Sequence, residues 1–198
     1  MTPDYGSQTT TFTFDVTKSP LFQKDQKNYI NILGVKQLNS LKNVSLLDIF
    51  LSNGNVVEPH YHPNAAELVY CISGSVHVAM LNPYTKQFQT YSIGPSQVVN
   101  IPQGWWHYEV ATSDNTHLLA IFNASTPEVV LGSDLLKFTP APIMAHTYCI
   151  DLAKWKSVIS SITPTMYIGP PNHCPKHSPT QPTYSTYYPY SNRYLFGM

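Results

Sequence analysis

Short runs of β-forming residues, separated by turn-forming residues, fill the first two thirds of the chain and constrain its fold more than any other feature. Runs that are rich in β-branched and aromatic residues and bounded by Gly, Pro, Asn or Asp are typical of strands. Many short strands at this spacing predict an all-β sandwich or barrel. We expect the strands at Thr9–Val16, Val44–Ser52, Val56–His62, Glu67–Ile72, Ser75–Leu81, Gln87–Ile93, Val98–Ile101, His107–Ala111 and His117–Phe122.

The last third of the chain has a different pattern. Asp134–Phe138 and Asp151–Ile162 are expected to form short helices on the outside of the barrel, the second with apolar residues at helical spacing. From about Thr163, prolines and tyrosines alternate without a helical or strand period, which predicts a peripheral arm. The expected organisation is N-terminal strands that pack on the barrel (1–43), a barrel core (44–125), a helical segment (126–163) and a Tyr/Pro-rich arm (164–198).

Two interpretations of the arm are open. It wraps the domain or a dimer partner and uses its tyrosines as apolar contacts, or it is an adhesive tail of a coat-like assembly. The first is favoured.

The composition excludes several classes of partner. Charged residues make up 11% of the chain and the formal net charge is zero, so nothing directs it to nucleic acid or to an anionic membrane surface. No apolar run approaches the ~20 residues of a membrane helix. The first residues lack the basic and apolar regions of a secretory signal, so a cytoplasmic location is the default expectation. The 3 cysteines are odd in number and widely spaced, which argues against a disulfide framework.

One group of residues has the spacing of metal ligands. His60 and His62 are two apart on a predicted strand, so both side chains point to the same face. Glu67 begins the next strand after a turn, and the Pro102-Gln-Gly104 turn brings His107 into the same interior. Taken singly, each of these residues reads as an ordinary polar group of the core or surface. Together, they predict a divalent-metal site.

The predicted ligand set also indicates what the site does. Three neutral imidazoles and one carboxylate leave a divalent ion with residual positive charge, and an octahedral ion keeps two positions open for water or a small-molecule ligand. Manganese, iron, nickel, cobalt and zinc all accept such a mixed nitrogen and oxygen set.

At these residues the chain resembles the cupin family. Gly54, His60, His62, Glu67 and Gly74 match the first cupin motif in full, and Pro102, Gly104 and His107 match the second. In the second motif the opening glycine, Gly94, lies two residues too early and Ala111 replaces the closing asparagine. Neither position is a ligand in the family.

The resemblance implies the cupin double-stranded β-helix, a jelly-roll barrel, with His60, His62, Glu67 and His107 as ligands. The run from His60 to Gly74 is most similar to oxalate decarboxylases and, more loosely, to germin-like oxalate oxidases. Because those decarboxylases use manganese, manganese is the first choice of metal. The chain holds a single His-x-His motif, which implies one cupin unit, and single units of this kind usually pair as homodimers.

Two departures bear on the reaction that the resemblance implies. Oxalate decarboxylases carry an arginine three residues before the first ligand histidine, where this chain has Val57. They also carry a glutamate on a lid after the second motif, where the segment that starts at Asn123 offers only Glu128.

Further candidates surround the site. Strand alternation aims Glu58 and Glu109 inward, provided that no bulge intervenes, as acid, base or partner of a ligand histidine. The alternative, weighted equally, is that one of these two glutamates lies in water at the barrel rim. Trp105 and Trp106 flank the second turn, where one is expected in the core and the other at the mouth as a substrate contact.

Three functions remain in competition. The first is a manganese or iron enzyme that oxidises or decarboxylates a small carboxylate or other oxygen-rich ligand. The second is a non-catalytic binding or structural protein whose metal stabilises the barrel. The third and weakest is a sugar-binding or sugar-isomerase cupin.

Overall fold

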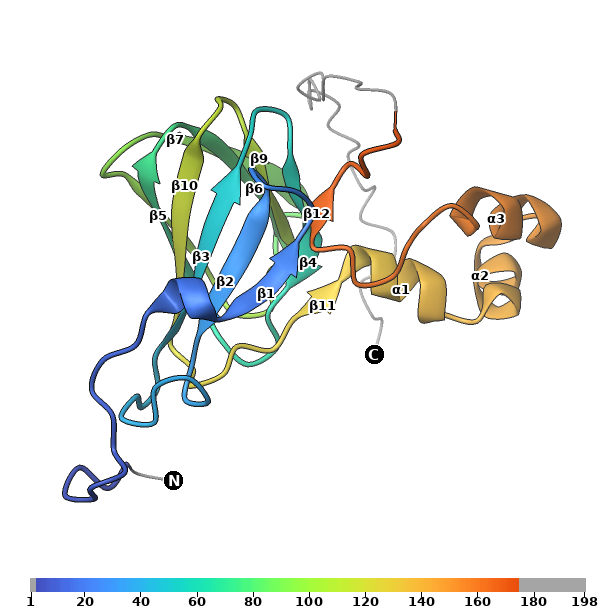
Figure 1. The fold of residues 1–198 in the computed structure, drawn as a ribbon. Helices are drawn as coiled ribbons and strands as arrows, with labels where there is room; N and C mark the ends of the chain where they lie inside the picture. Colours follow the sequence, from blue (N-terminus) through green and yellow to red (C-terminus); the bar gives the residue numbers. More distant parts are fainter. Residues whose placement is uncertain (1–2, 175–198) are drawn as a thin grey trace.

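The structure, a computed structural model, describes residues 3–174 and shows two antiparallel sheets that face each other as a jelly-roll barrel (Figure 1). The first sheet has the order β1-β2-β3-β10-β5-β8 and consists of β1 (Pro20–Gln23), β2 (Tyr29–Leu33), β3 (Ser45–Leu51), β10 (Thr116–Phe122), β5 (Glu67–Ser73) and β8 (Val98–Ile101).

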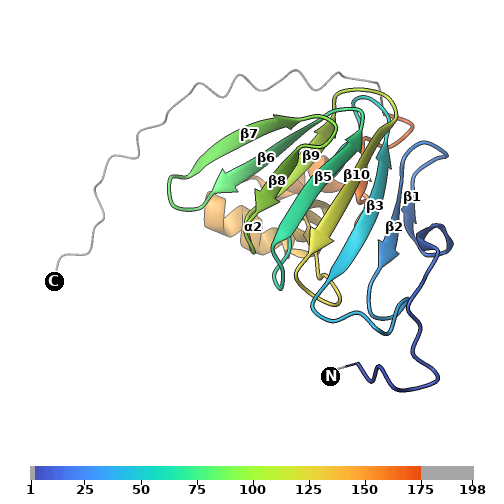
Figure 2. The ribbon, with the colours of Figure 1, turned by 90° about the vertical axis from the view of Figure 1, so that its left-hand side faces the viewer.

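The second sheet has the order β11-β4-β9-β6-β7, and β12 also pairs with β4. Its strands are β11 (Val130–Leu131), β4 (Val56–Tyr61), β9 (His107–Ala111), β6 (Val76–Asn82), β7 (Gln87–Ile93) and β12 (Ile168–Gly169). Figure 2 shows the two sheets closing around a common interior.

Alternation of buried and exposed positions along strands such as β9 and β10 builds the barrel core. In β10, every second residue from Thr116 to Phe122 is buried, and in β9 the buried residues are His107, Glu109 and Ala111. Burying one apolar face of each sheet against the other is the main driving force for this fold. The apolar side chains of the core include Ile49, Leu51, Val57, Val69, Val76, Val78, Met80, Val99, Ile101, Leu118 and Phe122.

Two glycines permit close turns beside the sheets. Gly74 has a φ of +75°, and a Cβ there would come within 2.6 Å of the Thr116 backbone. Gly104 has a φ of +78°, a conformation that residues with a Cβ rarely adopt, and its amide donates to the carbonyl of His62 at 3.0 Å.

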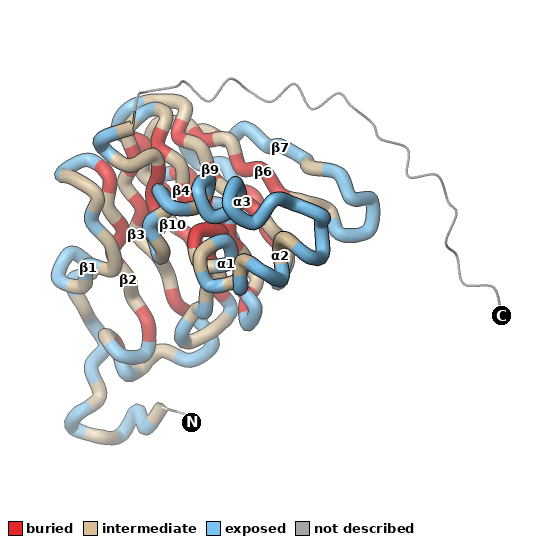
Figure 3. The backbone as a smooth tube through the Cα atoms, turned by 90° about the vertical axis from the view of Figure 1, so that its right-hand side faces the viewer, coloured by how far each residue is buried: buried red, intermediate tan, exposed pale blue. Residues whose placement is uncertain are grey.

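The helices lie beside the barrel and not within it. The helices are α1 (Gly132–Phe138), α2 (Ala141–Tyr148) and α3 (Leu152–Ile159), and α2 and α3 form a hairpin that projects from the barrel (Figure 1). Both helices of the hairpin are largely exposed (Figure 3). Among the described residues, no helix is long and apolar enough to cross a membrane.

The strand predicted at Thr9–Val16 is wrong. These residues form turns and irregular backbone that lead into a 3₁₀ helix at Val16–Lys18, and Phe12 is 66% exposed. An alternating pattern makes a strand only where a neighbouring strand pairs with it. Here the side chain of Asn39 takes that place: it accepts from the amide of Thr11 at 2.9 Å and donates to the carbonyl of Thr9 at 3.0 Å. The N-terminal strands lie instead at β1 and β2, and β2 pairs with β3.

The predicted helices are present with shifted ends, and three elements after β10 were missed, in addition to β1 and β2. The expected Asp134–Phe138 helix begins at Gly132, and the expected Asp151–Ile162 helix spans Leu152–Ile159. α2, β11 and β12 were not predicted because α2 has no clear apolar face and each of the two strands has only two residues. Most of the predicted arm, residues 175–198, lies outside the described part of the chain.

Candidate metal centre

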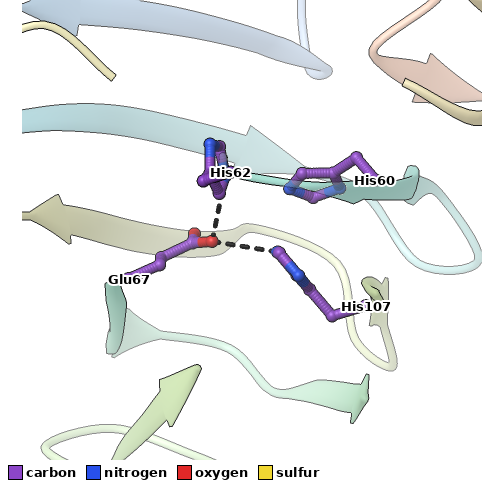
Figure 4. Close-up of side chains that lie close together, drawn as sticks. All are labelled: His60, His62, Glu67 and His107. Atoms are coloured by element: carbon purple, nitrogen blue, oxygen red, sulfur yellow. Dashed lines mark hydrogen bonds and ion pairs between the residues drawn. The ribbon is translucent and has the colours of Figure 1, made fainter. Parts of the chain in front are cut away.

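Four side chains converge inside the barrel (Figure 4). His60 comes from β4, His62 follows directly after it, Glu67 begins β5 and His107 begins β9. One ligand atom from each lies within 4.8 Å of the others, and the four residues are between 1% and 4% exposed. The structure therefore gathers the predicted set into one group that can hold a metal ion.

Pairing between strands brings these residues together. His60 lies directly opposite His107 in the β4–β9 ladder, and the tilted rings have centroids 4.0 Å apart. Glu67 is placed by the turn between β4 and β5 and by its position opposite Ile101 of β8. His62 packs edge-on against the ring of Phe122, with centroids 4.7 Å apart.

The three histidines share one hydrogen-bonding pattern. In each ring Nδ1 lies near a backbone carbonyl oxygen, at 2.6 Å from Glu58 for His60, 2.7 Å from Glu128 for His62 and 2.7 Å from Trp105 for His107. Because a carbonyl oxygen only accepts, each Nδ1 carries the proton and donates it. A neutral ring then presents a lone pair at Nε2.

The Nε2 atoms face the carboxylate of Glu67. Oε2 of Glu67 lies 3.0 Å from Nε2 of His107 and 3.2 Å from Nε2 of His62. Lone pairs on nitrogen and oxygen repel at these distances unless a proton or a metal ion lies between them. The residues present thus fit a cation, and a nitrogen and oxygen donor set of this kind suits a divalent transition metal.

Burial governs the protonation of the centre. Burial lowers the pKa of His60 well below its ordinary value, and the neighbouring His107 lowers it further. Burial alone would raise the pKa of Glu67, but its contacts with His107 and His62 outweigh that cost and hold the pKa below its ordinary value. Neutral imidazole and ionised carboxylate are the forms that bind metals.

Glu109 points into the same interior, as strand alternation predicts. It lies two residues after His107, is 1% exposed, and faces Val57 and Val78 across its two neighbouring strands. Its Oε1 lies 3.8 Å from Nε2 of His107, and within residues 3–174 neither of its oxygens has a hydrogen-bond partner. Burial raises the pKa of Glu109 well above its ordinary value, and the charge of Glu67 adds to the rise.

The inward orientation predicted for Glu58 is wrong, because a bulge does intervene. The register between β4 and β9 shifts between Val57 and His60, so Val57 takes the interior position opposite Glu109. Glu58 is buried on the other side of the strand, where it accepts from the amide of Ser133 at 2.9 Å and from its hydroxyl at 2.7 Å. Its carboxylate anchors α1 to the barrel and does not face the metal ligands.

The other candidates take separate positions. Glu128 is exposed, and only its backbone carbonyl reaches the site, through His62. Both tryptophans are partly buried: Trp105 packs against the core, and Trp106 packs near Tyr61, with ring centroids 6.3 Å apart. Trp105 also borders a hollow that the core residue Met80 lines.

Asn64 is a supporting residue that the sequence analysis missed. Its side chain donates to the carbonyl of Thr126 at 3.0 Å and accepts from the amide of Glu128 at 2.9 Å. It thereby holds the segment whose carbonyl orients His62. A turn asparagine gives no sequence signal for a contact with residues more than sixty positions away.

The family comparison agrees with the motifs. The sequence profile of the cupin family matches residues 16–152. Germin-like protein subfamily 2 member 1 of Arabidopsis thaliana is 31% identical over 112 residues, which make up 56% of this chain and 50% of that protein. The chain spans about half the length of the curated relatives it matches.

Solved structures agree on the fold. Bacillus subtilis oxalate decarboxylase, described with Mn(II) centres, superposes with a TM-score of 0.72 at 21% identity, over 88% of this chain and 45% of that chain. The coconut allergen cocosin superposes with a TM-score of 0.69 at 20% identity, over 78% of this chain and 42% of that chain. The predicted fold and the resemblance to oxalate decarboxylases and germin-like proteins are confirmed.

Proposed function

The chain belongs to the cupin family, and we propose that it is a divalent-metal enzyme that oxidises or decarboxylates a small oxygen-rich ligand. His60, His62, Glu67 and His107 hold the metal in this proposal, with manganese as the first choice and iron as the second. The observation that carries it is the convergence of three Nε2 lone pairs and one carboxylate in a buried space.

The metal would supply a Lewis acid for the ligand's oxygen atoms and, as manganese or iron, a redox couple. The protein supplies the surroundings. The carbonyls of Glu58, Glu128 and Trp105 fix the ring orientations. Val57 and Phe122, 6% and 1% exposed, keep water from the interior.

Glu109 is the residue that we assign to proton transfer. It is the buried carboxyl nearest the four ligands that does not belong to them, and both of its oxygens lack partners. A buried carboxyl whose pKa is raised well above its ordinary value keeps its proton to higher pH than an exposed carboxyl does, and in that form it can donate from Oε to a bound ligand.

The interior favours a ligand other than oxalate. Val57 stands at the position of the arginine that oxalate decarboxylases carry, and it faces Glu109 across the strands. An oxalate dianion would meet a valine and a second carboxyl there, without a cationic anchor. A ligand with one carboxylate, or with hydroxyl groups only, suits these walls better.

Metal content and turnover together test the proposal. The purified protein, expressed with manganese or iron supplied, should hold about one ion per chain, and His60→Ala and His107→Ala should lose it. The matched control is His146→Ala, because His146 is exposed on α2. A panel of carboxylates and hydroxylated compounds is then screened for carbon dioxide and peroxide release. A loaded protein that turns over none of them would overturn the enzyme proposal.

Exposed apolar side chains support a second candidate, a structural protein that assembles through its C-terminal third. The large apolar side chains that are 37% to 69% exposed on and between α1, α2 and α3 are Leu135, Leu136, Phe138, Ile143, Tyr148, Ile150, Leu152 and Val158. Ile168 is 1% exposed and pairs with β4, so a deletion that spares the barrel begins at residue 175. Under this candidate the deletion reduces assembly and leaves metal content unchanged. Unaltered assembly would show that residues 175–198 do not mediate it.

We also propose that the chain forms a homodimer. Leu68 and Ile72 are 37% and 40% exposed on β5, and they add apolar surface outside the barrel. Large exposed apolar surfaces of this kind usually mark contacts between proteins. Analytical ultracentrifugation decides between a monomer and a dimer.

A further inference from the structure

A hollow opens into the side of the barrel between β7 and β8. These strands are the last of their two sheets, and neither has a further neighbour in its own sheet. The hollow has a volume of about 370 Å³, within the usual range for small-molecule sites. We call it the lateral cleft; it is lined by Met80, Gln89, Tyr91, Val98, Val99, Asn100, Pro102 and Trp105.

The lateral cleft exposes an interior face. Gln89 lies opposite Met80 and Tyr91 lies opposite Val78 in the β6–β7 ladder. Met80 and Val78 belong to the buried core, so Gln89 and Tyr91 stand on the core-facing side of β7. Both are nevertheless exposed, Tyr91 by 42%. The barrel wall is therefore open at β7, and polar side chains occupy the inner positions.

The floor of the cleft borders the metal centre. Met80, 3% exposed, lines the cleft and lies directly opposite His107 in the β6–β9 ladder. Trp105 also lines the cleft, and its carbonyl orients His107. The flexible thioether side chain of Met80 is thus a neighbour of both the cleft and a ligand histidine.

The chemistry of the lining indicates the class of ligand. Among the described residues, those that line the cleft carry no charge. Gln89 and Asn100 offer amides, Tyr91 a hydroxyl that donates to Gln89 at 3.0 Å, and Trp105 a flat indole. Neutral donors and acceptors beside an aromatic face suit an uncharged ring that carries hydroxyl groups.

We propose that the lateral cleft is the access route and binding site for the organic part of the ligand, and that it selects neutral hydroxylated ring compounds over carboxylates. The inference rests on the oxidising form of the proposed function, because the metal centre is the destination of the route and a ligand without a carboxylate has no carbon dioxide to lose. A second hollow, of about 340 Å³, surrounds His117 on the outer side of the barrel and is lined by none of the four metal-ligand candidates.

Paramagnetic relaxation tests whether a ligand in the cleft lies near the metal, and it needs no activity assay. Phenol is the neutral probe and benzoate the anionic match, each added to protein loaded with manganese or, as the diamagnetic reference, with zinc. Phenol protons should relax at least tenfold faster with the manganese form, because paramagnetic relaxation falls steeply with distance. Equal relaxation in both forms, or benzoate binding as tightly as phenol, would overturn the inference.

A matched pair of variants locates the binding site. Gln89→Trp fills the cleft from the inner face of β7, whereas Thr90→Trp places the same side chain on the outer face of that strand. Phenol affinity should fall at least tenfold in Gln89→Trp and stay unchanged in Thr90→Trp, with both folds checked by circular dichroism. Wild-type phenol affinity in a folded Gln89→Trp protein would refute the proposal that the ligand binds in the lateral cleft.

The two proposals fail in different ways. If the protein takes up no metal, the proposed function fails, and saturation transfer from the metal-free protein to phenol still tests the cleft. If the metal binds but phenol does not, the cleft inference alone fails.

Discussion

The main-chain carbonyl oxygen of Glu128 lies 2.7 Å from Nδ1 of His62, although the two residues are 66 positions apart. Asn64 holds the segment that carries this carbonyl, by one hydrogen bond to Thr126 and one from Glu128. The orientation of one metal-ligand candidate therefore depends on a contact outside the barrel interior. Four side chains form the centre, and a fifth, that of Asn64, fixes the segment that orients one of them.

Asn64→Ala should weaken metal binding without abolishing it. Loss of both hydrogen bonds frees the segment around Glu128, and loss of a partner that orients a ligand typically costs about 10- to 100-fold in affinity. Competition with a fluorescent chelator measures the change. Asn82→Ala is the control, because Asn82 holds the β6–β7 turn through Tyr84 and Thr85. Equal affinities in the two variants would show that the segment does not matter.

Removal of the metal should lower the melting temperature. A ligand present at 100 times its dissociation constant stabilises the folded state by about 2.7 kcal/mol. For a chain of this size that energy corresponds to roughly 5–10 °C. Calorimetry before and after treatment with a chelator measures the drop, and manganese should restore it. His60→Ala, which lacks one candidate ligand, should show little response to the chelator.

Mild acid should destabilise the metal-free protein through His60. Its folded pKa lies well below the ordinary value of 6.5, so the unfolded chain binds the proton more readily. The stability due to the neutral ring is present above about 6.5 and is lost as the pH falls toward the folded pKa, by about 1.4 kcal/mol per pH unit. Melting temperatures between pH 7.5 and 5 should fall, with a smaller slope in His60→Gln; equal slopes would contradict the assignment.

Glu109→Met should stabilise the protein and abolish its activity. A carboxyl with a raised pKa contributes stability below its ordinary value of 4.5 and loses it as the pH rises through that value toward the folded pKa. Removing two buried oxygens without partners should therefore gain about 1–3 kcal/mol at neutral pH. Urea denaturation measures the gain and a turnover assay the loss. Wild-type turnover in Glu109→Met would show that Glu109 takes no part in the reaction.

Ser133→Ala should loosen α1 and leave the metal in place. The substitution removes the hydroxyl that donates to Oε1 of Glu58 and leaves a buried carboxylate oxygen unsatisfied, at a cost of about 1–3 kcal/mol. Faster hydrogen exchange in residues 132–138 and unchanged metal content are expected. Loss of metal in this variant would show that Glu58 acts on the centre after all.

The metal-ligand group could be predicted from sequence because its determinants are local. Strand alternation places His60 with His62, and His107 with Glu109, on common faces, and the turns bring the faces together. The fold was predicted from the resemblance that the two cupin motifs carry, and the family profile over residues 16–152 confirms it.

The remaining errors come from contacts between distant segments. The bulge that turns Glu58 outward arises from the register of β4 against β9, which the sequence of β4 alone does not specify. Thr9–Val16 has an alternating pattern but no partner strand, so it stays irregular. The lateral cleft depends on the distance between two sheet edges, which no local pattern encodes.

β4, which carries His60, obtains its outer neighbours from Val130–Leu131 and Ile168–Gly169. During synthesis these two short strands leave the ribosome long after β4 itself. Until then the strand has one free edge that can pair with other nascent chains. Nascent chains therefore carry this unprotected edge until both segments have been made, and chains that stop before residue 130 should aggregate more readily than chains that contain both short strands.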